Sequence, residues 1–167
     1  MHRAMDMDGA ASLSVSILVF KGDPLDYQRN RHTALAFRPL FQAGGQQLPP
    51  SASSSGSSAL VVHVVGPPGE LGLQVYDGYD ASRDPGRTLV RAVLVGTLRK
   101  EITKTELVQL LAQVPIDNAD REFNCQSWVE KGLRLLRRQE WVSEHEFEQG
   151  LDAMVECILE ADEEPEG

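Results

Sequence analysis

One cysteine of the 167-residue chain stands where a polar stretch gives way to a helical pattern. Residues 124–129 read Asn-Cys-Gln-Ser-Trp-Val, and Asn124 has the side chain of an N-cap. Cys125 is then the first residue of the predicted helix. Free N–H groups and the positive end of the helix dipole favour an anion there, so we expect a lowered thiol pKa and a nucleophilic thiolate. The alternative is a cysteine that only fills space in the core, as we expect of Cys157.

A cysteine nucleophile needs a base within hydrogen-bond reach and a third group that orients the base. His32 and His63 stand on neighbouring predicted strands, and His63 alternates with apolar residues. A buried imidazole needs a polar partner, because an unpaired polar group there costs about 1 to 3 kcal/mol. If the strands pair, one histidine can activate Cys125 while the other holds its ring. The alternatives are two independently satisfied histidines, or a zinc site formed by both histidines and Cys125.

The other two histidines and the arginines of the cysteine helix need no role in catalysis. His2 lies in a polar N-terminal stretch, and His145 lies in the exposed first turn of the last predicted helix. Arg134, Arg137 and Arg138 end the cysteine helix, beside the negative end of its dipole. We interpret these arginines as a solvated helix end rather than a phosphate-binding patch.

Composition narrows the class of protein. The net charge of −9 argues against a nucleic-acid partner, which would need a basic face. Two cysteines give no disulfide framework, so a reducing, cytoplasmic setting is expected. Residues 1–9 do not resemble a secretory signal, and the apolar run 13–20 is too short to span a bilayer. We expect no cofactor and no integral membrane segment.

Hydrophobic periodicity places these residues on an α+β fold. Runs rich in β-branched residues predict strands at 13–20, 32–37, 60–65, 71–76 and 89–98. Capping boxes at Thr103 and Ser143, together with Asn124, predict three helices. A block of strands followed by a block of helices indicates an antiparallel β-meander of about five strands packed against about three helices.

The same patterns predict one domain over residues 13–160. Residues 1–12 are expected to be disordered, and the acidic stretch 161–167 is expected to be a disordered tail. Residues 44–58 are rich in Ser, Gly and Pro and predict a flexible loop between the two histidine strands.

Three segments in chain order resemble the motifs of the lecithin:retinol acyltransferase-like family, within the circularly permuted, papain-like NlpC-type superfamily. They are 32–37 (His-Thr-Ala-Leu-Ala-Phe), 61–68 (Val-Val-His-Val-Val-Gly-Pro-Pro) and 124–129. The chain also resembles small uncharacterised fungal proteins with the pattern Asn-Cys-Gln-x-Trp-Val. The resemblance covers roughly residues 13–138. It implies a permuted papain-like fold with Cys125 as nucleophile, His32 as base and His63 as the polar third member.

The sequence therefore predicts a thiol acyltransferase or amide or ester hydrolase that works through a thioester on Cys125. N–H groups at the helix start would form the oxyanion hole, supported by Asn124 and Gln126. The substrate would be a small-molecule, lipid or peptide acyl compound. The alternative is a non-catalytic binding module on the same fold, with a groove near Cys125.

Overall fold

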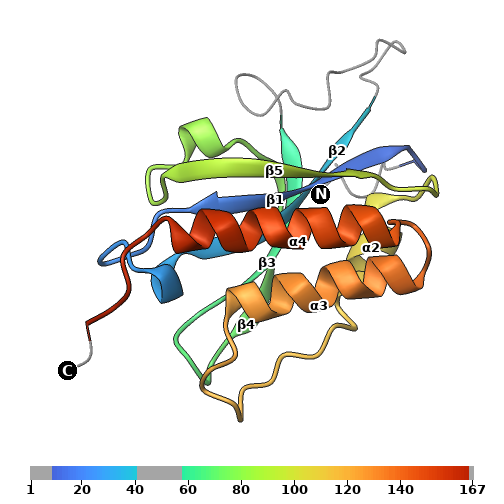
Figure 1. The fold of residues 1–167 in the computed structure, drawn as a ribbon. Coiled ribbons are helices and arrows are strands. Elements are labelled where there is room, and N and C mark those ends of the chain that lie inside the picture. The colour runs from blue at the N-terminus through green and yellow to red at the C-terminus, as the bar shows by residue number, and fades with distance from the viewer. Residues whose placement is uncertain (1–8, 41–57, 166–167) are drawn as a thin grey trace.

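The computed structural model describes residues 9–40 and 58–165, which form a five-stranded antiparallel sheet with three α-helices (Figure 1). The predicted α+β class is confirmed. Apart from Ser58, the predicted loop 44–58 lies outside the described residues, as does His2. The strands are β1 (Leu13–Phe20), β2 (His32–Pro39), β3 (Ala59–Val65), β4 (Gly72–Tyr79) and β5 (Leu89–Thr97). The helices are α2 (Lys104–Leu111), α3 (Cys125–Arg138) and α4 (Glu144–Leu159), with 3-10 turns η1 (Gln28–Asn30) and η2 (Ala81–Arg83).

The strand order β4-β3-β2-β1-β5 corrects one part of the prediction. The first four strands form the expected meander, but β5 pairs with β1 at the opposite edge from β4, for example through Ile17 and Val93. Burial explains the difference. β1 is buried along almost its whole length and needs neighbours on both sides, whereas β4 is mostly exposed, as suits an edge.

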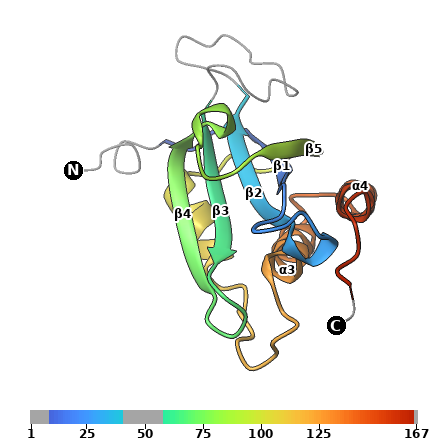
Figure 2. The ribbon, with the colours of Figure 1, turned by 90° about the vertical axis from the view of Figure 1, so that its left-hand side faces the viewer.

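Helices α3 and α4 run antiparallel across one face of the sheet, with α4 over β1 and β5 and α3 over β2 and β3 (Figures 1 and 2). Ile17, Leu35 and Val62 face this side and pack with Trp128 and Leu133 of α3 in the main core. A Cβ atom added at Gly132 would lie 3.0 Å from the Leu35 side chain. A small residue is therefore needed where α3 crosses β2.

The other face of the sheet carries a smaller apolar cluster that includes Phe20, Ala34 and Val61. Side chains alternate between the two faces along a strand. His32 shares the face of Ala34, and His63 shares the face of Val61. Both predicted histidines therefore lie on the face opposite α3 and α4.

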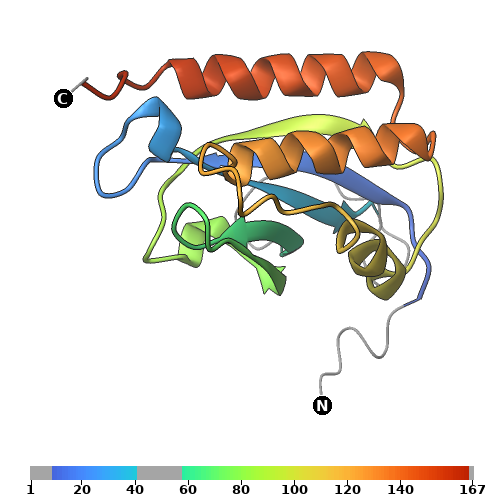
Figure 3. The same cartoon turned by 90° about the horizontal axis from the view of Figure 1, so that it is seen from below.

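Local capping signals fix where the helices begin. The predicted boxes Thr103–Glu106 and Ser143–Glu146 are both formed, and α3 begins at Cys125 with Asn124 as its N-cap. Figure 3 shows how the short turn after α3 sends α4 back alongside it.

The ends of the described chain are held more firmly than their composition predicts. Ala11 pairs with Ile102 in a short bridge, within the stretch 1–12 expected to be disordered. At the other end, Ala161 is buried and Asp162 bridges to Tyr27. Acidic composition predicted solvation there, but Gln28 of η1 donates hydrogen bonds to the backbone carbonyls of Ala161 and Asp162.

Candidate functional site

The two predicted histidines lie side by side at one end of the sheet. Both are buried, and His32 Nε2 lies 2.7 Å from His63 Nδ1. The pairing of β2 with β3 brings them together across 31 residues of sequence. The predicted proximity of His32 and His63 is confirmed.

A third residue, Gln74 of β4, completes this chain of contacts. Its Oε1 lies 2.7 Å from His63 Nε2, and the two residues are direct partners in the β3–β4 pairing. Sequence reasoning missed Gln74, because an exposed-looking glutamine on a predicted strand carries no motif. Gln74 could have been identified as the partner of His63 across the β3–β4 hairpin if the register of the two strands had been known.

The contact with Gln74 fixes the proton positions along the chain. The Gln74 oxygen can only accept, so His63 Nε2 carries the proton and donates it. His63 Nδ1 is then the acceptor for the N–H at Nε2 of His32. The remaining nitrogen of His32, Nδ1, then carries a lone pair that accepts no hydrogen bond from the residues that the structure describes, and it is the basic atom of the group.

Burial keeps both imidazoles neutral. It lowers the pKa of His32 to about 3, with smaller contributions from the charges of Arg87 and His63. Burial also lowers the pKa of His63, opposed in part by the hydrogen bond to Gln74. A neutral imidazole is the form that can accept a proton.

Cys125 reaches the same end of the sheet from the helix side. Its Sγ lies 3.8 Å from the carbonyl oxygen of Arg31, the residue before His32. In the described part of the chain, no hydrogen bond joins Cys125 to either histidine. Cys125 and His32 nevertheless line one cavity of about 310 Å³. The structure thus brings the two histidines together and places the thiol at a cavity that His32 also lines, without a direct thiol–imidazole hydrogen bond.

The expected lowering of the Cys125 pKa is wrong. Burial raises the pKa of this thiol, and the contribution of Thr33 opposes the rise only in part. The helix start gives little help: the Gln126 N–H makes only a small contribution to lowering this pKa, and it is also bonded to Asn124. Asn124 Oδ1 accepts from the N–H of Gln126 at 3.0 Å and from that of Ser127 at 3.2 Å.

The two predicted supporting residues hold the backbone in place. Gln126 Nε2 donates to the carbonyl oxygens of Gln28 and Arg31, both at 3.0 Å, and so ties the start of α3 to η1 and β2. Asn124 is occupied as the N-cap. The N–H of Cys125 donates no hydrogen bond within the described residues, which leaves it as the available oxyanion donor.

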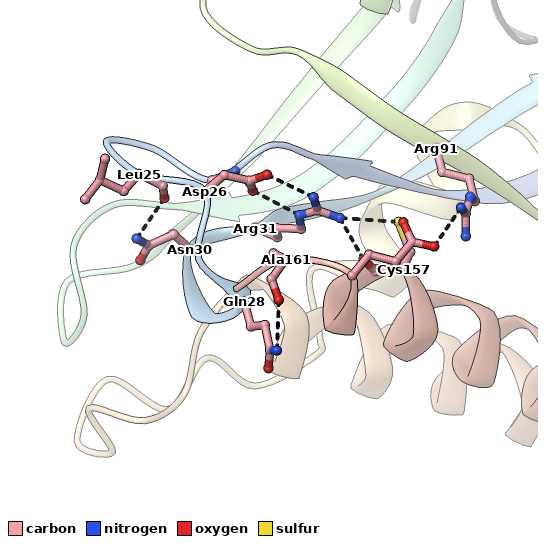
Figure 4. A network of polar contacts seen from close by, with 10 residues as sticks. Leu25, Asp26, Gln28, Asn30, Arg31, Arg91, Cys157 and Ala161 are labelled. Carbon is pink, nitrogen blue, oxygen red and sulfur yellow. Dashed lines mark hydrogen bonds and ion pairs between the residues drawn. The ribbon is translucent and has the colours of Figure 1, made fainter. Parts of the chain in front are cut away.

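A buried arginine that sequence reasoning missed stabilises this corner (Figure 4). Arg31 forms an ion pair with Asp26 at 2.9 Å and donates from Nη1 to the Cys157 carbonyl at 2.7 Å. The hydrogen bond from Arg31 lowers the pKa of Asp26 to about 2. The side chain of Arg31 therefore anchors the end of α4, while its carbonyl contacts the thiol and Gln126.

No protein-family model, no curated protein and no solved structure matches the chain. None of the described helices has the length and apolar character needed to cross a membrane. The described residues also contain no group of three or more His, Cys, Asp or Glu side chains that could hold a metal ion. The zinc alternative for His32, His63 and Cys125 therefore has no support in the geometry.

Proposed function

We propose that this protein is a cysteine-dependent acyl-transfer enzyme, an acyltransferase or an amide or ester hydrolase, with Cys125 as nucleophile and His32 as base. The observation that carries the proposal is the chain His32–His63–Gln74, which leaves His32 with a free lone pair at the cavity it shares with Cys125. The resemblance of these segments to the lecithin:retinol acyltransferase-like motifs supports the same assignment.

The two pKa directions favour general-base catalysis over a preformed ion pair. A raised thiol pKa and a lowered imidazole pKa keep Cys125 and His32 both neutral before reaction. As Sγ attacks the substrate carbonyl carbon, His32 takes the thiol proton. The Cys125 N–H stabilises the oxyanion. His32 then returns the proton to the leaving group, and the thioester forms on Cys125.

The second half of the cycle uses the same groups. His32 removes a proton from water or from another nucleophile as it attacks the thioester, and the thiol leaves with that proton. His63 is a positioning residue that holds His32 in one tautomer, and Gln74 does the same for His63. Catalytic hydrogen bonds are often longer in a free enzyme than in its substrate complex. The missing thiol–imidazole hydrogen bond is therefore compatible with this mechanism.

The test is acylation by activated neutral esters, p-nitrophenyl acetate and butyrate, followed by intact-mass and peptide mass spectrometry. We expect one acyl group on Cys125 and none in Cys125→Ala. In His32→Asn we expect acylation slower by at least about a hundredfold, the usual contribution of a general base. Cys157→Ala is the matched control and should react like the wild type. Equal labelling of Cys125→Ala and wild type would disprove the proposal.

The binding-module alternative is favoured by one observation: in the described part of the chain, no hydrogen bond joins Cys125 to either histidine. It predicts a folded protein in which no ester acylates Cys125 under any condition. The same mass measurement therefore separates the two functions. We further propose a reducing, cytoplasmic setting, which would keep both free cysteines, Cys125 and Cys157, as thiols.

A further inference from the structure

Arg87 stands between the two cavities that adjoin the histidine chain. It lies on the connection from η2 to β5 and is half-buried, with its guanidinium carbon 5.8 Å from the centroid of the Phe20 ring. One cavity is the 310 Å³ space of His32 and Cys125. The other, of about 370 Å³, is lined by Arg87 together with His63, Gln74 and Tyr79.

The Arg87 guanidinium has no ion-pair or hydrogen-bond partner among the residues that the structure describes. Asp84, an acidic residue on the same connection, lines the second cavity with Arg87 but forms no ion pair with it; its pKa is lowered by the hydrogen bond from Tyr79, with a smaller contribution from the charge of Arg87. Asp84 accepts a hydrogen bond of 2.6 Å from the Tyr79 hydroxyl and one of 2.9 Å from the Gly86 N–H. In a chain with a net charge of −9, an arginine at a cavity that forms no ion pair with the described carboxylates is a position that can receive an anion from outside.

The other charged residues of the 310 Å³ cavity, which His32 and Cys125 line, change this conclusion little. Arg121 also lines it and has no ion pair in the described part of the chain, so it adds a second positive charge. Asp23 and Glu122 line it too, but both are exposed, and solvent screens their repulsion. Arg87 is less exposed and held over an aromatic ring, so its charge acts more strongly within the cavity.

The pKa shifts of the neighbouring His32, His63 and Cys125 agree with a position of Arg87 beside these residues. The charge of Arg87 adds to burial in lowering the pKa of His32 and of His63, and it opposes the rise that burial causes in the pKa of the Cys125 thiol. Its field therefore reaches all three groups of the proposed reaction. An anion bound to Arg87 would offset that field at His32 and make the imidazole a stronger base.

We propose that Arg87 binds an anionic carboxylate or phosphate group of the substrate, beside Cys125 and His32. The anion site itself rests on the geometry of Arg87, whereas the role of the bound molecule as acyl donor rests on the proposed function. A guanidinium presents two parallel N–H donors, which match the oxygens of either group.

Equilibrium binding tests the site without any chemistry. Isothermal titration calorimetry would compare succinate and inorganic phosphate with the neutral analogue succinamide. We expect wild type to bind at least one of the anions and not succinamide, and Arg87→Gln to bind that anion at least about tenfold more weakly. The charge-matched control is Arg138→Gln, at the far end of α3, which should bind like the wild type. Equal affinity of Arg87→Gln, or no anion binding by wild type, would overturn the proposal.

Two further measurements make the result unambiguous. If Arg87→Gln fails to fold by circular dichroism, Arg87→Lys replaces it and should bind the anion more weakly than wild type, because it keeps the charge and loses the paired donors. The rate of Cys125 acylation would then be compared for p-nitrophenyl acetate and the p-nitrophenyl monoester of succinate. A preference for the charged ester that is lost in Arg87→Gln supports the assignment.

Anion binding without acylation by either ester retains the site and refutes the acyl-transfer function. Acylation with no effect of Arg87→Gln on either measurement retains the function and refutes the site.

Discussion

The imidazoles of His32 and His63 are joined by a hydrogen bond of 2.7 Å between Nε2 of the first and Nδ1 of the second. The bond requires one ring to donate and the other to accept, so the two tautomers are not independent. Gln74 selects which ring donates, because its oxygen accepts from His63 Nε2. The free lone pair therefore falls on His32, the histidine at the cavity of Cys125.

Replacing Gln74 by leucine should disturb this arrangement. The N–H of His63 would lose its acceptor, so we expect a loss of about 1 to 3 kcal/mol in the free energy of unfolding. Imidazole nitrogen chemical shifts, measured by NMR, should show His32 protonated at Nε2 in the wild type and a mixture of tautomers in Gln74→Leu. Gln113→Leu, at an exposed position after α2, should change neither quantity. An unchanged tautomer in Gln74→Leu would show that the glutamine does not direct the chain.

Stability should fall as the solution is acidified below neutrality. The pKa of His32 is lowered from 6.5 to about 3, so between these values the unfolded chain binds a proton that the folded protein does not. The stabilisation is fully present above pH 6.5 and is lost as the pH falls toward 3. Its slope is about 1.4 kcal/mol per pH unit at most for one histidine. His63, also lowered, adds in the same direction.

Urea unfolding between pH 7 and pH 4.5 measures this slope. The range stays above 3.8, the ordinary pKa of the Asp26 carboxyl, which is lowered to about 2 in the folded protein, so the Asp26–Arg31 ion pair contributes little to the change. We expect His32→Asn to flatten the slope, whatever its effect on absolute stability. His145→Asn removes an exposed histidine and should keep the wild-type slope. Parallel curves for wild type and His32→Asn would contradict a neutral, buried His32.

The thiol of Cys125 should react slowly with iodoacetamide at neutral pH. Burial raises its pKa, so the thiolate fraction at pH 7 is below that of a free thiol, whose pKa is about 8.5. Peptide mass spectrometry would follow Cys125 and the buried Cys157 in the same sample. We expect the alkylation rate of Cys125 to rise only at alkaline pH. A thiolate already present at neutral pH would indicate that a Cys125–His32 ion pair forms instead.

The ion pair of Arg31 with Asp26 should contribute more to the free energy of unfolding than the exposed ion pair of Arg29 with Glu164. Arg31 has a side chain only 7% exposed, whereas Arg29 and its partner Glu164 are 55% and 47% exposed. Replacing Arg31 removes a charged donor from the Asp26 carboxylate and from the Cys157 carbonyl, which then keep hydrogen bonds from the N–H groups of Gly22 and Glu160. We therefore expect Arg31→Ala to lower the free energy of unfolding by about 2 to 4 kcal/mol. Arg29→Ala should cost less than about 1 kcal/mol. Denaturant titration of both variants checks the contrast, and equal losses would refute it.

The sequence alone was sufficient for features that depend on neighbours along the chain. The three helix starts follow from side chains that cap N–H groups two or three residues away, as Asn124 does for Gln126 and Ser127. The fold class follows from apolar periodicity, which differs between strands and helices. The closeness of His32 and His63 follows from the pairing of successive strands.

Only the tertiary structure decided what depends on contacts far apart in sequence. β5 pairs with β1 because β1 must satisfy backbone groups on both sides, a need that no local pattern in β5 reveals. The roles of Gln74 and Arg31 were identified only from their contacts in the fold, with His63 and with the Cys157 carbonyl. The pKa of Cys125 depends on how far burial removes the sulfur from water and on which groups surround it. Desolvation and hydrogen bonding are properties of the packed neighbourhood, so the helix start by itself predicted the wrong direction.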